Sequence, residues 1–222
     1  MTTKEAMSAR HMVRKYTGRK IPRDVEEQLM ERIHQNNEKC GLSMRLVTDN
    51  ADALNMFIKL VLAKGVRNYI VLAGKNSEDV DEKLGYCGAD VMLFAQTLGL
   101  NSWWVGGTFS RSGVKKNAGV ADDERIAGII AIGYGATQGI PHKSKRPEEI
   151  SSYAGTAPDW FQEGVGAVLL APTALNKQAF NIRGEGNKVS MTCDNGIYAG
   201  IDLGIGRYHF EAGAGKNHFE WV

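Results

Sequence analysis

Cysteine is scarce in this sequence, and its few copies lie far apart. Cys40, Cys87 and Cys193 are the only three among 222 residues, and no two of them form a CxxC pair. An odd number of scattered cysteines argues against a disulfide framework and is typical of reduced thiols in the cytoplasm. The five histidines are equally scattered, with no HExxH motif, so the sequence indicates no metal site.

Motifs for side-chain nucleophiles and for nucleotide loops are also missing. The sequence contains no GxSxG, no GxxxxGK[S/T] and no GxGxxG that opens a helix. If the protein is an enzyme, we therefore expect no catalytic side chain. A bound cofactor would carry out the difficult chemical step.

Long apolar runs and a strong net charge are absent as well. No stretch is long enough to span a bilayer, and the N-terminus, MTTKEAMSARHMVRKY, lacks the apolar core of a secretory signal. We therefore expect a cytoplasmic protein without a membrane partner. The net charge is only +2, with basic and acidic residues interleaved, which disfavours nucleic acid as a partner.

The remaining composition is that of an ordinary globular protein. It is 43% hydrophobic and 23% charged, and 222 residues suffice for one well-formed core. No internal repeat and no low-complexity linker is visible. We therefore predict a single domain over residues 1–222.

The most apolar segment covers residues 85–107. Residues 89–98 are apolar on nearly every face, which predicts a helix buried in a core or against a second subunit. Gly99 is suited to end this helix, and residues 100–105 follow as a short buried strand. Gly106 and Gly107 then leave bare backbone that a flat ligand could approach, although a simple turn in the core explains them equally well.

Hydrophobic periodicity predicts further helices and strands on both sides of this segment. Helices are expected over residues 3–11, 24–37, 49–63, 111–118, 160–170 and 195–213. Strands are expected over residues 43–48, 69–73, 125–133, 180–183, 188–193 and 219–221, with a hairpin at 184–187. This mixture predicts an α+β fold with a mixed central sheet flanked by helices.

Two cationic clusters are far apart in the sequence. The first contains Arg10, His11 and Arg14, and Arg10 and Arg14 would share one face if they lay on a helix. The second contains Lys143, Lys145 and Arg146, after a strand and a glycine-rich loop. Each cluster is either a solvated basic face or part of an anion site, because arginine offers paired donors that suit phosphate.

Four segments resemble those of nitroreductase-like FMN flavoproteins. They are RHMVRKY from Arg10, LGLNSWWVGG, IAIGYGATQGIPHKSKRPEEI and APTALNKQAF. The Asn/Gln loop lies late in the chain, at residues 171–180, as in the putative-nitroreductase branch of that family. Three positions depart from the usual pattern: Met12 replaces Ser, Ala179 replaces Pro and Phe180 replaces Trp.

The resemblance implies the FMN-dependent nitroreductase fold and a bound FMN. Arg10 and His11 would contact the phosphate or ribityl chain, and Lys145 or Arg146 would close on the phosphate. Arg14 would lie near the pyrimidine edge of the ring, and the backbone of residues 105–107 near N5. The full expected set is Arg10, His11, Met12, Arg14, Trp104, Val105, Gly106, Gly107, Lys145, Arg146, Thr173, Asn176 and Gln178. Thr173 and Asn176 would reach the flavin of a second subunit.

The resemblance further implies a homodimeric oxidoreductase. NAD(P)H would give hydride to flavin N5, and an electron-poor acceptor such as a nitroaromatic or a quinone would take the electrons. One alternative is a protein that uses reduced flavin as a substrate, or as a sensor without turnover. Another is a structural α+β dimer whose basic clusters are merely solvated.

Overall fold

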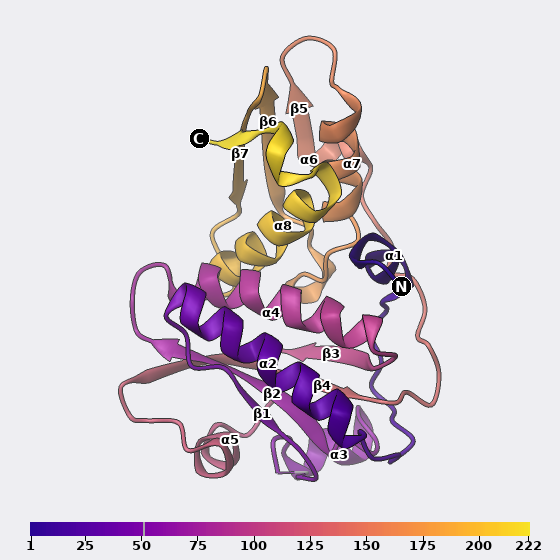
Figure 1. The fold of residues 1–222 in the computed structure, drawn as a ribbon, viewed down its shortest axis with the longest axis vertical. Coiled ribbons are helices and arrows are strands. Elements are labelled where there is room, and N and C mark those ends of the chain that lie inside the picture. The colour runs from indigo at the N-terminus through magenta and orange to yellow at the C-terminus, as the bar shows by residue number, and fades with distance from the viewer. Residues whose placement is uncertain (51) are drawn as a thin grey trace.

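The computed structural model describes residues 1–50 and 52–222. Its strands form two four-stranded sheets, each in its own lobe, and the lobes meet across a pair of helices (Figure 1). The α+β class is confirmed. The strands do not lie in one central mixed sheet, because β5 (Ser151–Tyr153) pairs with β6 (Phe180–Glu185) and starts a second sheet.

The sheet of the first lobe is antiparallel throughout and has the order β1-β2-β4-β3. These strands are β1 (Arg45–Val47), β2 (Asn68–Lys75), β3 (Asn101–Val105) and β4 (Glu124–Gly133). The helices of this lobe are α2 (Arg23–Cys40), α3 (Met56–Val61), α4 (Val80–Thr97) and α5 (Arg111–Ala118). Side chains alternate between the two faces, so Trp104 packs under α4 while Trp103 packs on the opposite face. Helices cover both faces, which is why β2 is apolar at nearly every position.

The sheet of the second lobe has the order β5-β6-β7-β8 and is mixed. The predicted hairpin is confirmed as β6 and β7 (Lys188–Cys193), while β5 and β8 (Glu220–Trp221) run parallel to their neighbours. The other elements of this lobe are α6 (Pro147–Ile150), α7 (Asp159–Val168), the 3₁₀ turns η1 (Ala174–Asn176) and η2 (Lys216–His218), and α8 (Ala199–Ala214). Phe161, Phe180 and Phe210 lie in its core.

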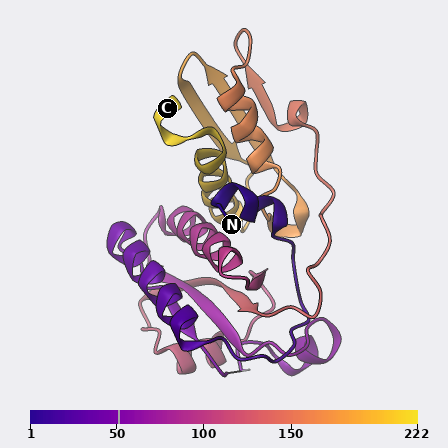
Figure 2. The same ribbon diagram turned by 45° about the vertical axis from the view of Figure 1, so that its right-hand side comes forward.

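The apolar helix predicted around residues 89–98 is confirmed as the C-terminal half of α4. It is buried between the first sheet, α2 and α8, and the N-terminal helix α1 (Thr3–Ala9) lies across the junction of α4 and α8 (Figures 1 and 2). None of the described helices is long and apolar enough to cross a membrane. The cover over α4 comes from its own chain, so burial of this helix gives no reason to expect a second subunit.

Local structure differs from expectation at two places. Helix α1 ends at Ala9, and residues 10–16 run extended beside the first sheet, so Arg10 and Arg14 share no helix face. The helix expected over residues 49–63 is reduced to α3, with Phe57 exposed; residue 51 lies outside the described residues. The thiols of Cys40 and Cys87, distant in sequence, lie 3.1 Å apart because α2 packs on α4.

We predict that both lobes unfold in one transition, as the single domain expected from the sequence requires. Phe210→Ala would empty a fully buried site of the second lobe and lower the free energy of unfolding by about 3–5 kcal/mol. Urea unfolding can be followed in the first lobe by the fluorescence of Trp103 and Trp104, with Trp160 and Trp221 replaced by Phe. The free energy of unfolding measured there should fall by the same amount. The exposed Phe57→Ala is the control. An unchanged first-lobe midpoint in Phe210→Ala would show two independent domains.

Candidate functional site

The extended segment after α1 places the first cationic cluster beside β3. The Val13 amide donates to the Ser102 carbonyl at 3.0 Å, and Met12 pairs with Ser102 in a parallel bridge. The loop after β4 closes over this segment at Gly139, where an added Cβ would lie 2.8 Å from His11 Cβ and from the Met12 carbonyl oxygen. Gly139 also has φ +75°, so both space and backbone conformation require glycine.

The late Asn/Gln loop folds onto the second cationic cluster. Gln178 Oε1 accepts from the Lys145 amide at 2.7 Å, and Lys145 Nζ donates to the Gln178 carbonyl at 3.0 Å. Asn176 Nδ2 donates to the Lys143 carbonyl at 2.8 Å. The structure therefore brings together the second cationic cluster and the Asn/Gln loop, although Lys145 and Gln178 are 33 positions apart in the sequence.

The backbone of this loop is held in an uncommon conformation. Leu175, Asn176 and Gln178 all have positive φ, at 54°, 55° and 45°. Such conformations persist in non-glycine residues only where surrounding contacts hold them, and they cluster at ligand sites. Here the Gln178 side chain also donates to the Leu169 carbonyl at 2.9 Å, which anchors the loop on the end of α7.

Arg10 is a buried cation without a partner. Arg10 is only 4% exposed, and its Nε has no hydrogen-bond partner among the described residues. No described carboxylate forms an ion pair with it either. Burial lowers the pKa of Arg10 to about 10, so it stays charged at neutral pH. A buried and unpaired charge is unfavourable, and an anion would remove this cost.

Histidines, and not acids, surround Arg10. Burial, and then the charge of Arg10, lowers the pKa of His11, and His142 lies close enough to add to the effect. His209 of α8 is fully buried, with Nδ1 2.8 Å from the Ile205 carbonyl oxygen and Nε2 unpartnered among the described residues. Burial lowers the pKa of His209 to about 4, and this ring therefore stays neutral beside Arg10.

Of the three cations in the second cluster, Lys145 lies against the Asn/Gln loop. Arg146 instead pairs with Glu148 at 3.2 Å and with Glu149 at 3.3 Å, where it begins α6. Its charge is therefore already shared with two carboxylates. Lys145, by contrast, forms no ion pair among the described residues.

A tyrosine lies against the paired glycines that end β3. A Cβ at Gly106 would lie 2.9 Å from the Tyr198 ring, and one at Gly107 would lie 2.8 Å from the Tyr198 hydroxyl. The Trp104 side chain points the other way and packs on Gly88 of α4, so only its backbone can border a ligand here. Arg14 is exposed and lies over the Trp103 ring, 5.2 Å from its centroid, apart from Arg10.

Asp202 of α8 ties the Asn/Gln loop to the end of the site near Tyr198. Both of its carboxylate oxygens accept from the Ala174 amide at 3.1 Å. Burial raises the pKa of Asp202 to about 6, although this hydrogen bond acts in the opposite direction. Sequence reasoning missed Asp202, Tyr198 and His209, since each lies in or next to the last predicted helix with no motif around it. His142 lies inside a quoted segment and could have been singled out.

The residues present fit FMN by their chemistry. Arg10 and Lys145 are cations suited to a dianionic phosphate, and His11 and His142 add ring nitrogens that can form hydrogen bonds. Gly106 and Gly107 lie against Tyr198, and Asp202 nearby on α8 holds the Asn/Gln loop, so polar groups and bare amides suited to a flat heterocycle lie near the start of α8. The orphaned guanidinium of Arg10 is the observation that most requires an anionic group. Contacts of individual residues with flavin remain predictions.

The chain matches the family described as Putative TM nitroreductase over residues 2–214. It therefore belongs to that family, which places it among the oxidoreductases. No curated protein matches the chain.

Solved structures show the same fold. A putative nitroreductase from Thermotoga maritima is similar at TM-score 0.68 and 22% identity, over 98% of this chain and 85% of that one. A putative NADH dehydrogenase/NAD(P)H nitroreductase from Parabacteroides distasonis has TM-score 0.53 and 20% identity, over 67% of this chain and 95% of its own. A putative NADH oxidase from Clostridium acetobutylicum has TM-score 0.52 and 18% identity, over 65% and 96%. The nitroreductase fold expected from the resemblance is confirmed.

We predict that Asp202→Asn stabilises the protein above pH 6. Because the folded-state pKa of Asp202 is raised from 3.8 to about 6, ionisation favours the unfolded chain as pH rises between these values. The gain should be about 1–3 kcal/mol at pH 7–8 and vanish below pH 4, as measured by urea unfolding across pH. Asparagine still accepts from the Ala174 amide. Exposed Asp123→Asn controls for the lost charge, and a pH-independent gain at Asp202 would contradict the burial effect.

Proposed function

We propose that the protein is an FMN-dependent oxidoreductase that passes electrons from NAD(P)H to a small electron-poor acceptor, such as a nitroaromatic or a quinone. Arg10 is the observation that carries the proposal. It is buried near His11 and His209, and no described carboxylate neutralises it. Membership of the nitroreductase family supports FMN as the anion.

Different residues would bind the phosphate and the ring of FMN. Arg10 and Lys145 would hold the phosphate, and His11 and His142 would add donors there. Gln178 keeps Lys145 in place through two hydrogen bonds and so positions it. Gly106 and Gly107 would present backbone N–H groups to the ring edge, where no side chain of their own obstructs approach.

FMN, when bound, supplies the hydride-accepting and electron-donating centre that the side chains of this chain lack. Tyr198 lies where the ring end is expected and would limit the size of the acceptor. Arg14 is exposed and could turn from Trp103 toward the pyrimidine edge, where a cation stabilises negative charge.

The proposal needs no second chain. The homodimer remains a prediction from the resemblance, but α4, the helix expected to form its seam, is covered by α8 of the same chain. Thr173 and Asn176 are expected to reach a partner's flavin, yet Asn176 already contacts Lys143 of its own chain, and Thr173 accepts from the Gln178 amide beside Lys145.

An absorption spectrum tests the proposal directly. Purified protein incubated with FMN and desalted should be yellow, and NAD(P)H added without oxygen should bleach it. Admission of air should restore the flavin bands. Loss of the flavin spectrum with a new product would indicate that flavin is a substrate, and protein that retains no FMN would overturn the proposal.

Arg10→Met should weaken FMN binding yet stabilise the flavin-free protein. The variant keeps the volume of the side chain but removes the buried charge, so the apoprotein should gain about 1–3 kcal/mol. FMN affinity should fall at least about 100-fold, equivalent to about 2.7 kcal/mol. Fluorescence titration and thermal unfolding measure the two effects. Exposed Arg183→Met is the matched control and should change neither; unchanged FMN affinity in Arg10→Met would remove Arg10 from the site.

A further inference from the structure

Helices α4 and α8 pack closely because each has a glycine that lies against a backbone carbonyl of the other helix. A Cβ at Gly85 of α4 would collide with the Ile201 carbonyl oxygen, and a Cβ at Gly204 of α8 would collide with the Glu82 carbonyl oxygen. Gly85 and Gly204 are 119 positions apart, and so are Glu82 and Ile201. Gly85 thus contacts Ile201, and their equivalents Gly204 and Glu82 contact each other in the same way. Reciprocal contacts of this kind are the pattern made by a two-fold axis between equal subunits.

A third contact lies where such an axis would pass. A Cβ at Gly200 would lie 3.0 Å from Asp81 Cβ, and these two positions are again 119 apart. A contact between a position and its own equivalent occurs only at the axis. The three contacts therefore define one local two-fold relation between α4 and α8.

The same separation extends to the neighbouring strands. Helices α4 and α8 start 119 positions apart, at Val80 and Ala199, and β3 and β8 also start 119 apart, at Asn101 and Glu220. Strands β2 and β7, which precede the helices, start 120 apart. Because β8 is parallel to β7, and β3 has the same direction as β2 with β4 between them, the pairs also agree in orientation.

We propose that the chain is two half-repeats folded into an internal pseudo-dimer, which is monomeric in solution and carries one ligand site. Residues 1–146 form the first half and residues 147–222 the second. In each half a helix precedes a strand pair, α2 before β1 and β2, and α7 before β6 and β7, and a long helix and a strand follow. Within the described residues, the second half has no counterpart of β4 and α5, and the first has no counterpart of the Asn/Gln loop.

The candidate site is assembled from both halves. Arg10, Gly106 and Lys145 come from the first half, while the Asn/Gln loop and His209 come from the second. The second half therefore takes the place that a partner subunit would have. The segment 134–146 connects the lobes and delivers Lys145 to the loop (Figure 2).

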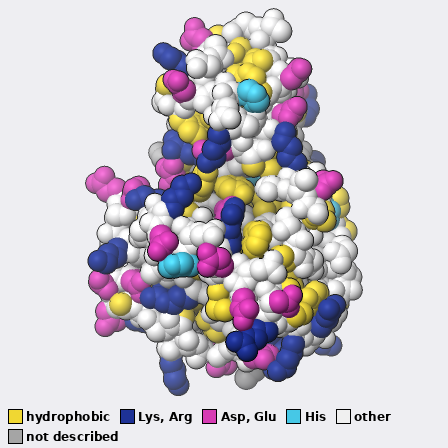
Figure 3. Space-filling view, in the orientation of Figure 1, with side chains coloured by type: hydrophobic (Ala, Val, Ile, Leu, Met, Phe, Trp, Pro, Cys, Tyr) yellow, Lys and Arg dark blue, Asp and Glu magenta, His cyan; other side chains and the backbone are white. Residues whose placement is uncertain are grey.

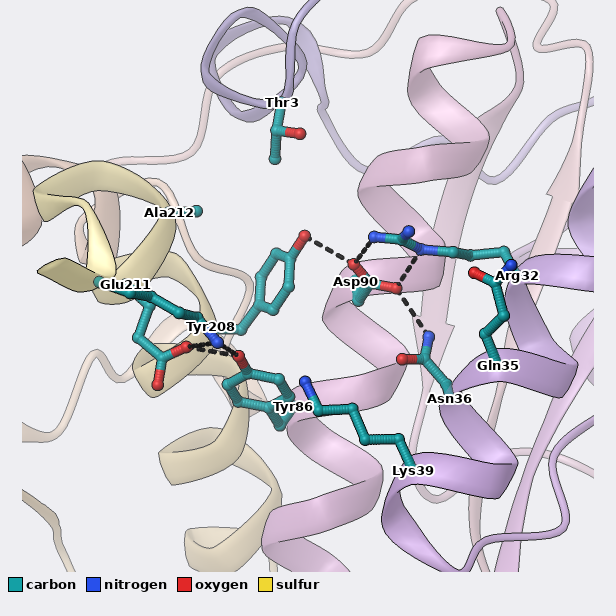
Figure 4. Close-up of a pocket in the computed structure, with 11 residues that line it drawn as sticks. Thr3, Arg32, Gln35, Asn36, Lys39, Tyr86, Asp90, Tyr208, Glu211 and Ala212 are labelled. Carbon is teal, nitrogen blue, oxygen red and sulfur yellow. Dashed lines mark hydrogen bonds and ion pairs between the residues drawn. The ribbon is translucent and has the colours of Figure 1, made fainter.

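The equivalent position on the other side of the axis has its charges paired by side chains of the same chain. At a separation of 119, His209 corresponds to Asp90, which lines an open pocket of about 490 Å³ between α2, α4 and α8 (Figure 4). Asp90 accepts two hydrogen bonds from Arg32, at 2.7 and 2.6 Å, and one from Tyr208 at 2.8 Å. Lys216 pairs with Glu211 at 2.5 Å in the same pocket.

Charge in this pocket is thus matched within the chain. On the face drawn in Figure 3, Lys and Arg side chains near the waist between the lobes lie among acidic ones. No described cation there is buried and unpaired in the manner of Arg10. We therefore assign one anion site to each chain.

The extent of the structural matches agrees with this division. The proteins from Parabacteroides distasonis and Clostridium acetobutylicum match over 95% and 96% of their own lengths, but over only 67% and 65% of this chain. A nearly complete nitroreductase chain thus corresponds to two thirds of this one. The remaining third is what an added partial subunit would contribute.

The mass in solution is the first test, and it is independent of flavin. Light scattering behind size exclusion should give 24.3 kDa at all concentrations from 1 to about 100 µM. Twice that mass would overturn the monomer. The number of sites rests on the proposed function: titration should end at one FMN per chain, and two would overturn the single site.

Complementation between defective chains is the second test. Arg10→Met removes the buried cation from the first half. Gln178→Glu places a carboxylate beside Lys145 in the second half and leaves the side-chain volume at position 178 unchanged. Co-expressed chains would form one intact site per dimer if sites were built between subunits. We expect the mixture to retain no more FMN than either variant alone. If the two chains paired at random, sites built between subunits would restore about a quarter of the wild-type flavin content, and that recovery would contradict a site built within one chain.

Glycine variants test the axis itself. Gly85→Ala and Gly204→Ala should each lower the melting temperature and by similar amounts, since they break equivalent contacts. Gly166→Ala, on the exposed face of α7 with nothing within 4 Å of the added Cβ, is the matched control and should raise it slightly. A large loss at one of Gly85 and Gly204 with none at the other would contradict the two-fold relation.

Discussion

The packing of α4 against α8 is the contact on which the rest of the structure depends. It joins the cores of the two lobes, it fixes where Asp202 and His209 lie, and it holds the Asn/Gln loop within reach of Lys145. Glycine at positions 85 and 204 lets the two backbones approach closely, and larger residues would push the helices apart. Because one ligand site spans both lobes, its geometry depends on this distance between helices.

The second constraint is electrostatic. Protein interiors seldom hold a charge without a partner, since the cost of desolvation is several kcal/mol. Arg10 is such a charge, whereas most other buried or half-buried cations here are paired, as Arg32 is with Asp90 and Arg45 with Glu124. The contrast within one chain distinguishes a site prepared for an anion from ion pairs that only support the fold.

The sequence predicted most elements and part of the site. Apolar periodicity located β2, α4, β4 and the β6–β7 hairpin, because these segments are buried through their own patterns. It could not reveal that the strands divide into two sheets, since β5 is only three residues long and its partner is set by the crossing of the chain. The spacing of Arg10 and Arg14 would give them a common face on a helix, whereas in the structure they lie in an extended segment beside β3.

The internal relation was invisible in the sequence for a physical reason. Its signature is a contact between backbone atoms, at Gly85 and Gly204, and the side chains around these glycines differ between the halves because each lobe packs a different core. Tyr198, Asp202 and His209 likewise acquire their setting only when α8 meets α4 and the loop at 171–180. The resemblance assigned Thr173 and Asn176 of this loop to a partner subunit. In the structure the loop contacts Lys143 and Lys145 of its own chain.

A fused pair can use its two halves differently, whereas two identical subunits cannot. In a symmetric dimer the residue at position 90 and its equivalent would be the same. Here one is Asp90, which binds Arg32 and Tyr208 and strengthens the helix contact, and the other is His209, which stays neutral beside Arg10. A carboxylate at position 209 would pair with Arg10 and satisfy the charge that an anionic ligand is needed to satisfy. The difference between Asp90 and His209 therefore decides which side of the axis stabilises the fold and which side remains open to an anion.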